Sequence, residues 1–240
     1  MQALSSTIAT QLHHRSIRQF TEQPIAEQIC QQLIDVARMS SSSNHLQCIS
    51  IVRITDMALR EQIMACASHQ VYIKQAPEFW VFCVDFAKHQ QLCEQAQLDY
   101  TEVALIGAVD AGIMAQNVMV AAESLGLGGV FIGALRNHIE KVGELLHLPP
   151  HCFAVLGLCL GYPDQNPPQK PRLPQQTMCF ENQYQPLTQN QLDSYNQDIK
   201  NYYQQRGKTR DWYANIAKTL AQPVRPHILP YLQQQGFMKK

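Results

Sequence analysis

The stretch "EVALIGAVDAGIMAQNVMVAAESL", residues 102–125, decides how the rest of the chain has to fold. Its length and spacing predict a single long helix. Small or apolar residues occupy nearly the whole circumference of that helix, and a helix that is apolar all round has to be buried all round. A central core helix of a monomer and a helix packed against a partner subunit both meet this requirement, and the pattern favours neither.

The segments on either side of this helix alternate between helical and extended patterns. Gly126 is well placed as the C′ residue that ends the long helix, and "GLGGVFIGAL" then starts a strand. The spacing of apolar residues predicts further helices over 5–14, 24–40, 57–67 and 137–147, and strands over 48–55, 78–86 and 152–163.

The last quarter of the chain changes character. A Pro-rich loop, "PDQNPPQKPRLP", precedes a region rich in Gln, Asn and Tyr that begins at Leu187. Helical stretches are predicted near 189–205, 211–221 and 226–235. This pattern indicates a core over 1–186 and a helical C-terminal extension of the same domain over 187–240.

Composition and charge exclude several classes of protein. The 240 residues are 45% hydrophobic and 16% charged, which is typical of a globular chain. Lys plus Arg is 19 and Asp plus Glu is 19, so the zero net charge argues against general nucleic-acid binding but allows a local basic pocket. The sequence has no signal-like N-terminus and no uninterrupted apolar run of about 18 residues, so we expect a cytoplasmic protein.

The eight cysteines suggest neither a disulfide framework nor a zinc site. None of them forms a CxxC pair, and most lie in apolar runs such as "FWVFCVDF" and "VLGLCLGY". Buried, reduced thiols are the expected state in a chain of this length without a signal sequence. No His/Cys cluster has the spacing of zinc ligands.

Two short basic groups are candidates for anion binding. Arg15 and Arg18 flank Ser16 in "LHHRSIRQF", and Lys170 and Arg172 flank a proline in "KPR". Each group alone is consistent with a solvated surface or a basic helix end. Together the four cations could surround one dianion such as a phosphate, with serines 40–43 as neutral donors, if the fold brings them together.

The familiar catalytic motifs are missing from the sequence. "GLGGVFIG" does not open a helix after a strand, so it is a poor Rossmann fingerprint, and the P-loop, GxSxG and HExxH motifs are absent. His14 and Asp110 could act as acid and base, but nothing in the sequence pairs them. If the chain is an enzyme, this lack of proton-transfer residues indicates that a bound cofactor carries the chemistry.

Six blocks in fixed order carry a family resemblance that covers essentially the whole chain. They are "HRSIRQFTEQPI" (14–25), "SSSNHLQCISIVRITD" (41–56), "APEFWVFCVDF" (76–86), "AAESLGLGGVFIGALRN" (121–137), "LGLCLGYP" (156–163) and "KPRLP" (170–174). The chain resembles the oxygen-insensitive NADPH nitroreductase and NADPH:flavin oxidoreductase family, the group A bacterial FMN-dependent nitroreductases. Six ordered blocks are far more specific than any single motif.

The resemblance implies an α+β fold of the nitroreductase/FMN-reductase type. Its features would be a central, mostly antiparallel sheet flanked by helices, a helical C-terminal extension and an intertwined, obligate homodimer with an FMN in each of two interface clefts. The implied reaction is ping-pong: NADPH reduces the flavin, NADP⁺ leaves, and a nitroaromatic, a quinone or a free flavin accepts two electrons.

The resemblance also implies roles for individual residues. The residues that match FMN-binding positions are His14, Arg15, Ser16, Ile17, Arg18, Ser42, Ser43, Gln70, Tyr72, Phe131, Ile132, Gly133, Ala134, Lys170, Pro171 and Arg172. The serines would reach the flavin of the other subunit, and the segment 131–134 would meet its reactive edge. Arg206 and Arg210 match a loop that binds the 2′-phosphate of NADPH, and Arg225 matches the substrate end of the cleft.

Two residues depart from the family pattern. The family more often has glycine in place of Ala134 and an aromatic residue in place of His45. Ala134 keeps its backbone N–H, so a backbone contact survives unless φ must be positive. His45 would lie in the cleft wall, where it would alter the choice of substrate.

Three other functions compete with the NADPH-dependent nitroreductase. One is a flavin reductase that supplies reduced FMN to a partner, and another is a non-catalytic FMN-binding protein. The third is a helical interaction protein, which only the C-terminal quarter favours. A yellow colour that NADPH bleaches would separate the enzymes from the other two.

Overall fold

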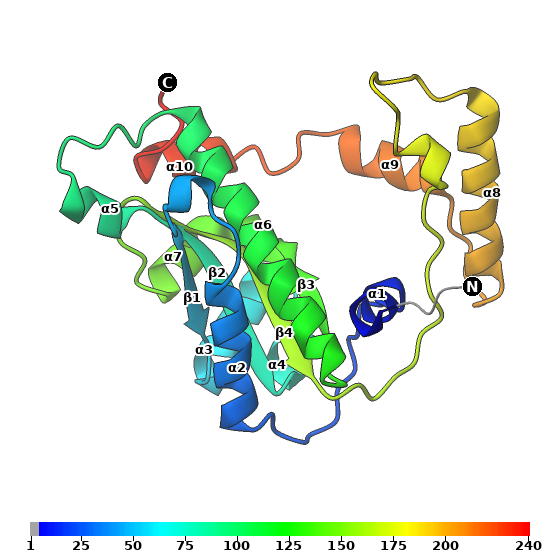
Figure 1. The fold of residues 1–240 in the computed structure, drawn as a ribbon, viewed down its shortest axis with the longest axis horizontal. Coiled ribbons are helices and arrows are strands. Elements are labelled where there is room, and N and C mark those ends of the chain that lie inside the picture. Colours follow the sequence, from blue (N-terminus) through cyan, green and yellow to red (C-terminus); the bar gives the residue numbers. More distant parts are fainter. Residues whose placement is uncertain (1–4) are drawn as a thin grey trace. The chain divides into compact units, whose positions relative to one another are not determined.

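The computed structural model describes residues 5–240, and they form two compact units. The first unit comprises the chain up to Pro167 together with His227–Lys240, and the second comprises Pro168–Pro226. The sheet and most of the helices belong to the first unit (Figure 1). The division expected from the sequence, 1–186 and 187–240, stays a prediction.

A four-stranded antiparallel sheet forms the centre of the first unit. Its strands are β1 (Ile49–Arg53), β2 (Glu78–Asp85), β3 (Gly128–Ile132) and β4 (Cys152–Gly161), in the order β1-β2-β4-β3. Every neighbouring pair is antiparallel, as the sequence analysis expected. Seven of the eight residues of β2 are buried, so its nearly continuous apolar run belongs to a strand that is covered on both faces.

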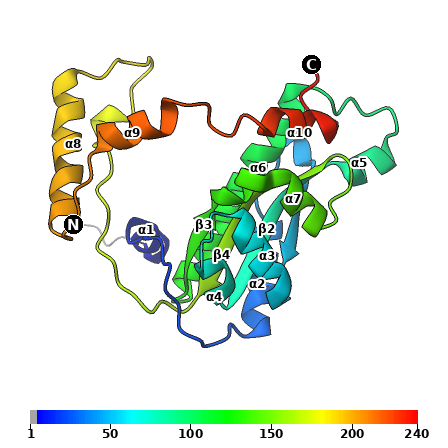
Figure 2. The same cartoon turned by 180° about the vertical axis from the view of Figure 1, so that it is seen from behind.

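Helices cover both faces of this sheet. The even-numbered residues of β2, such as Trp80 and Phe82, share a core with α2 (Glu27–Arg38) and α6 (Thr101–Ser124). The odd-numbered residues, such as Phe79, share a second core with α3 (Met57–Cys66), α4 (Tyr72–Gln75) and α7 (Ile139–Leu145). Figure 1 shows the α2 and α6 face, and Figure 2 shows the α3 and α7 face.

Helix α6 lies against the sheet along one side only. At Gly107 the helix approaches β2 so closely that a Cβ atom would lie 2.5 Å from Cγ1 of Val84. The opposite side exposes Leu105, Val109 and Ile113, with exposed fractions of 52%, 59% and 43%. A single chain therefore does not bury this helix all round, which disagrees with a central core helix of a monomer but not with a helix that packs against a partner subunit.

The length and composition of α6 would also suit a membrane span, although one such helix is weak evidence for a membrane protein. Its buried side includes Asp110 and packs against α2 and the strands, as expected for a core helix. We therefore assign α6 to the core of the first unit.

The short elements of the first unit surround this core. They are α1 (Ser6–Leu12), η1 (Ser43–His45), α5 (Ala87–Leu92), η2 (Gly133–His138) and α10 (Ile228–Gln234). The sequence patterns predicted neither α4 nor α5, which have four and six residues. All eight cysteines are free and six of them are buried, whereas Cys93 and Cys179 are exposed, so the expectation of burial is wrong for these two.

The second unit consists of η3 (Gln175–Thr177), α8 (Gln189–Gln204) and α9 (Trp212–Leu220). A capping box formed by Thr188 and Gln191 begins α8. The rings of Tyr195 and Trp212 pack edge to face with their centroids 4.9 Å apart and join α8 to α9. Both helices agree with the predicted stretches 189–205 and 211–221.

Candidate functional site

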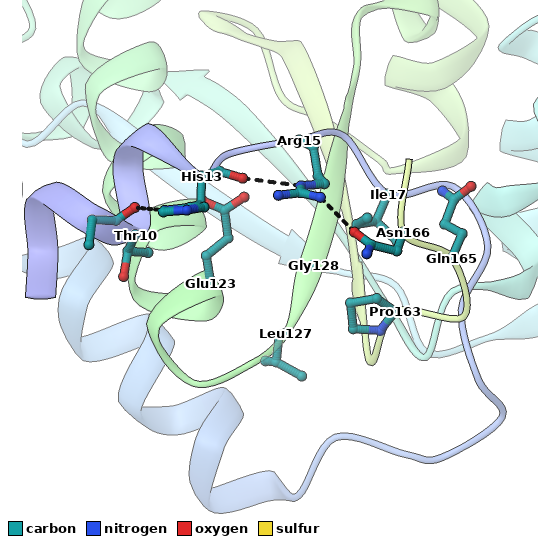
Figure 3. Close-up of a pocket in the computed structure, with 11 residues that line it drawn as sticks. Thr10, His13, Arg15, Ile17, Glu123, Leu127, Gly128, Pro163, Gln165 and Asn166 are labelled. Carbon is teal, nitrogen blue, oxygen red and sulfur yellow. Dashed lines mark hydrogen bonds between the residues drawn. The ribbon is translucent and has the colours of Figure 1, made fainter. Parts of the chain in front are cut away.

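Arg15 lies on the wall of a pocket of about 600 Å³ in the first unit (Figure 3). Its Nη1 donates to Oδ1 of Asn166 (2.5 Å) and to the carbonyl of Pro167 (3.2 Å), and its Nε donates to the carbonyl of His13 (3.3 Å). All of these acceptors are neutral. Arg15 is half-buried, and no carboxylate of residues 5–240 forms an ion pair with its guanidinium, although Glu123 also lines the pocket.

Backbone contacts fasten the Arg15 loop to the sheet. The N–H of Ile17 donates to the carbonyl of Gly129 in β3 (2.9 Å), and the buried side chain of Ile17 lies against Gly128. A Cβ atom at Gly128 would come within 2.5 Å of Cγ1 of Ile17, so the close approach requires glycine there. Residues 14–18 thus run beside the strand that ends in the predicted flavin-contacting segment 131–134.

His14 has a partner that the sequence did not suggest. Its Nδ1 lies 2.6 Å from Oε1 of Glu123, near the C-terminal end of α6. The side chains of His14 and Glu123 are 26% and 12% exposed, and Oε2 of Glu123 is buried without a partner. The pair ties the Arg15 loop to α6, and 109 residues of sequence separate its members.

Asp110 holds the serine run against the middle of α6. This carboxylate is 4% exposed and accepts from Oγ of Ser42 (2.8 Å) and from the N–H of Ser43 (3.2 Å). Oγ of Ser42 in turn accepts from the N–H of Gln47 (2.7 Å). Asp110 is therefore a structural anchor rather than the acid or base considered in the sequence analysis.

The serine loop carries backbone strain next to its predicted ligand-binding residues. Asn44, His45 and Gln47 have φ values of 48°, 57° and 54°, in the left-handed region that non-glycine residues rarely adopt. Such strain persists only where surrounding contacts hold it, and it concentrates at functional sites. His45 is exposed, and its Nε2 lies 3.2 Å from Nε2 of Gln47, so its ring remains on the surface.

The segment 131–134 connects β3 to the 3₁₀-helix η2. Phe131 and Gly133 are half-buried, whereas Ile132 and Ala134 are buried. Ala134 does not have a positive φ, so alanine fits where the family more often has glycine.

The turn that carries Gln70 and Tyr72 lies beside η2. Nδ2 of Asn137 donates to Oγ of Ser68 (2.7 Å) and so links η2 to this turn. Gln70 and Tyr72 are both half-buried, at the turn and at the start of α4.

The second unit contains the remaining predicted cations. Lys170 and Arg172 are exposed, and the half-buried Pro171 between them accepts from the hydroxyl of Tyr195 (3.2 Å). Arg206 and Arg210 are exposed on the loop between α8 and α9. Arg225 lies just before the chain returns to the first unit and is half-buried.

Ion pairing distinguishes the predicted phosphate ligands from several other cations of the described residues. Seven of them form ion pairs with carboxylates: Arg38, Arg53, Lys74, Lys88, Lys141, Lys200 and Lys240. Within residues 5–240, no carboxylate pairs with any of the six cations predicted to bind phosphates, namely Arg15, Arg18, Lys170, Arg172, Arg206 and Arg210. The predicted phosphate ligands thus belong to the cations for which these residues provide no carboxylate partner.

The sequence found these cations but missed the carboxylates that hold the surrounding loops. Glu123 and Asp110 both lie on α6, and local patterns gave no indication that they bind His14 and Ser42. A buried carboxylate in an otherwise apolar helix was the available signal, because such a group is retained only where it has partners. Residues 5–240 contain no cluster of His, Cys, Asp and Glu that could bind a metal.

The fold and these loops define an α+β protein of the nitroreductase type. The nitroreductase family model matches residues 12–162, and the model of the nitroreductase family C-terminal domain matches residues 170–240. The chain belongs to the nitroreductase family.

Three relatives extend over almost the full length of the chain. The oxygen-insensitive NADPH nitroreductase of Salmonella typhimurium is 50% identical, and the match covers 98% of this chain and 99% of that protein. The structure of nitroreductase A from Vibrio parahaemolyticus has a TM-score of 0.96 at 48% identity and covers 99% of this chain and 100% of its own. The structure of the Vibrio harveyi NADPH:FMN oxidoreductase in complex with NAD⁺ has a TM-score of 0.94 at 47% identity and covers 98% of this chain and 100% of its own.

The contacts of Asp110 lead to a stability prediction. Asp110→Ala should lower the free energy of unfolding by about 1.5–3 kcal/mol, because it removes a charged acceptor from Ser42 and Ser43. Asp110→Asn keeps one acceptor oxygen and should lower the free energy of unfolding by less. Urea unfolding of both variants measures the effect, and limited proteolysis should cut the Ala variant faster within residues 40–47.

Asp35→Ala provides the matched control for this experiment. Asp35 is 67% exposed and pairs with Arg38 on the surface of α2, so its removal should change the unfolding free energy by less than about 1 kcal/mol. Equal losses in the Asp35→Ala and Asp110→Ala variants would show that the serine loop does not depend on Asp110.

Proposed function

We propose that the chain is an NADPH-dependent FMN oxidoreductase that transfers electrons in pairs to nitroaromatics, quinones or flavins. The names of its full-length relatives, an NADPH nitroreductase and an NADPH:FMN oxidoreductase, support this class of reaction. The observation that carries the proposal is that six cations at the positions expected to bind the phosphates of FMN and NADPH form no ion pair with a carboxylate of residues 5–240.

The residues of the first unit fit an FMN phosphate and ring. Arg15 presents a guanidinium with neutral partners to a pocket of about 600 Å³, a combination suited to an anion. The loop 14–18 is fixed to β3, whose C-terminal end continues into residues 131–134. We assign His14–Arg18 to the phosphate and ribityl chain, and Gln70, Tyr72 and residues 131–134 to the ring.

Three residues of the second unit complete the assignment. Lys170 and Arg172 are further ligands for the FMN phosphate, and Pro171 keeps the segment between them extended. Proline also restricts the backbone of Lys170 before it.

FMN, when bound, supplies the acceptance and donation of an electron pair together with a proton. The polypeptide then needs no nucleophile or metal, and its residues orient the ligands and balance their charge. Backbone N–H groups of residues 133–134 would stabilise negative charge at the ring edge. Ping-pong kinetics is part of this proposal: parallel initial-rate lines with NADPH and an acceptor would support it.

Arg206 and Arg210 are assigned to the 2′-phosphate of NADPH, and Arg225 to the substrate end of the cleft. The two loop arginines are exposed and lack carboxylate partners among the described residues, so their interaction with a phosphate would be screened by salt. The preference for NADPH over NADH should accordingly be modest for each residue.

A homodimer is the second part of the proposal. Leu105, Val109 and Ile113 are spaced four residues apart and form an exposed apolar row on α6. Asp110 and Glu123 anchor the serine loop and the Arg15 loop at points separated by about 20 Å along α6. This separation supports the proposal that the serine loop of one subunit contacts the FMN bound by the partner subunit. The cytoplasmic location expected from the sequence also stays a proposal.

One experiment separates this proposal from the alternatives. The purified protein should be yellow, NADPH should bleach the colour, and a nitrofuran, a quinone or free FMN should restore it. A coloured protein that NADPH does not bleach would be an FMN-binding protein without this activity, and a colourless protein that FMN cannot reconstitute would contradict flavin binding. Steady-state rates with the three acceptors side by side distinguish a nitroreductase from a flavin reductase.

The first prediction concerns FMN retention. Arg18→Ala and Lys170→Ala should each weaken FMN binding about tenfold or more, because charge-assisted hydrogen bonds contribute about 1.5–3 kcal/mol. The measurement is flavin content after dialysis together with fluorescence titration of the apoprotein. Arg38→Ala removes an exposed cation that already pairs with Asp35 and should leave binding unchanged. Wild-type FMN content in both test variants would contradict the assignment.

The second prediction concerns assembly. Light scattering should give twice the chain mass of 27.3 kDa at all workable concentrations, with an interface larger than about 2,000 Å². Val109→Asp places a charge in the exposed apolar row of α6 and should dissociate the dimer and reduce FMN retention. A monomeric wild type that still binds FMN would overturn the proposed assembly.

The third prediction concerns the nicotinamide donor. Arg206→Ala should raise KM for NADPH and leave NADH turnover and the acceptor half-reaction unchanged, because only NADPH has a 2′-phosphate. The measurement is kcat/KM for both donors at low and high salt, with Lys218→Ala as an exposed control in the same unit. An unchanged NADPH/NADH ratio in the Arg206→Ala variant would mean that other residues recognise the phosphate.

A further inference from the structure

Two adjacent tyrosines at the end of α8 bind three of the six unpaired cations. Cζ of Arg206 lies 5.4 Å from the ring centroid of Tyr202, and Nη1 of Arg206 also donates to the Tyr202 hydroxyl (2.6 Å). The ring of Tyr203 has two cations near it: Nζ of Lys170 at 5.7 Å and Cζ of Arg210 at 5.2 Å. All of these residues belong to the second unit.

The end of α8 is built to fix the loop that carries these arginines. The N–H of Lys208 donates to the carbonyl of Tyr203 (2.9 Å) and the N–H of Gly207 to that of Gln204 (3.0 Å). With Gly207 at a φ of +64°, these bonds form a Schellman motif, which ends the helix in a defined turn. The loop therefore leaves α8 in a fixed direction just after Tyr203.

The other end of the same loop is equally well fixed. Oδ1 of Asp211 caps α9 by accepting from the N–H of Ala214 (2.9 Å), and Oδ2 accepts from Nζ of Lys200 (2.9 Å). These contacts, with the hydrogen bond from Asn196, lower the pKa of Asp211 to about 2. The carboxylate consequently stays charged at neutral pH, and Arg210 precedes an anchored residue.

The contacts at Tyr203 suit cations that have to meet phosphates. A guanidinium that stacks on a ring keeps its in-plane N–H groups free for bidentate contact with an oxyanion, and an ammonium near a ring keeps its donors. An exposed arginine or lysine otherwise loses side-chain entropy worth up to about 2 kcal/mol when a ligand immobilises it. A ring that restrains the side chain beforehand reduces this loss.

We propose that Tyr203 is a positioning residue that holds Lys170 for the phosphate of FMN and Arg210 for the 2′-phosphate of NADPH. One aromatic ring then supports the recognition of phosphate on both ligands. This inference rests on the proposed function, because that proposal assigns the two cations to these phosphates. It adds a residue whose role lies in its aromatic ring and not in its hydroxyl.

The test compares ligands that differ only in the relevant phosphate. Equilibrium dissociation constants of NADP⁺ and NAD⁺ for the holoenzyme give one ratio, and those of FMN and riboflavin for the apoprotein give the other. Because an exposed cation–π contact contributes about 0.5–1 kcal/mol, Tyr203→Leu should reduce the preference for the phosphorylated ligand about two- to fivefold in both ratios. Tyr203→Phe keeps the ring and should preserve both preferences.

Tyr184→Leu is the matched control. Tyr184 is a 77% exposed tyrosine of the same unit that packs against Phe180, and no lysine or arginine of residues 5–240 stacks on its ring. Both ratios should remain at the wild-type value in this variant. If Tyr203→Leu does not fold, ring fluorination of the Tyr203→Phe variant weakens the cation–π contact with little change in size and takes its place.

Two double-mutant cycles assign each effect to its cation. Tyr203→Leu should no longer change the NADP⁺/NAD⁺ ratio when Arg210→Met is present, and it should no longer change the FMN/riboflavin ratio when Lys170→Met is present. Unchanged ratios in the Tyr203→Leu variant would overturn the inference, even with a lower melting temperature, and so would effects that persist in both backgrounds. A wild type that binds neither FMN nor NADP⁺ would instead contradict the proposed function.

Discussion

The packing of α6 against the sheet is the contact on which the rest of the first unit depends. It requires a glycine at 107, because any larger residue would collide with Val84 in β2. At this distance α6 covers one face of the sheet and places two carboxylates beside the candidate site. Asp110 anchors the serine loop and Glu123 anchors the Arg15 loop. One helix therefore supports the core and also positions two separate groups of predicted ligand-binding residues.

The charges around these loops indicate which cations support the fold and which remain for a ligand. Arg60 is 3% exposed and donates to the carbonyls of Ile54, Ala76 and Pro77, so its guanidinium is used entirely within the structure. Arg53 pairs with Glu78 and Glu27, and the hydrogen bonds with Glu78 raise its pKa well above the ordinary value. Arg15, by contrast, has only neutral acceptors and faces a pocket.

Periodicity and turn residues were sufficient to predict most of the helices and strands, whereas the antiparallel arrangement of the sheet was expected from the family resemblance. The strands at 49–53 and 78–85 and the long helix at 101–124 lie within two residues of their expected bounds, because their apolar patterns are long and regular. The four-residue α4 is too short to show a period. The sequence also left open what covers the outer side of α6, because an apolar pattern cannot tell a surface covered by the same chain from a surface covered by another.

The sequence predicted less of the candidate site than of the fold. The resemblance found its cations, but the pairs His14–Glu123 and Ser42–Asp110 join residues 109 and 68 positions apart and have no local signature. The contacts of Tyr203 with Lys170 and Arg210 also have no local sequence signature, because the two cations lie on different loops. Sequence similarity can thus suggest which groups meet a ligand, whereas the side chains that contact those groups are found only when distant segments are placed together.

Substitutions in the two units should therefore have different effects on the protein. A substitution at Gly107 or Asp110 acts on the core and on the serine loop at once, because both depend on the position of α6. The loop between α8 and α9 is fixed at its own ends by the turn at Gly207 and the cap at Asp211, with contacts that lie within the second unit. Arg206 and Arg210 can therefore change without loss of packing in the sheet. If this loop binds the 2′-phosphate as proposed, substitutions in it should alter the preference between nicotinamides while the assigned flavin-ring residues of the first unit stay as they are.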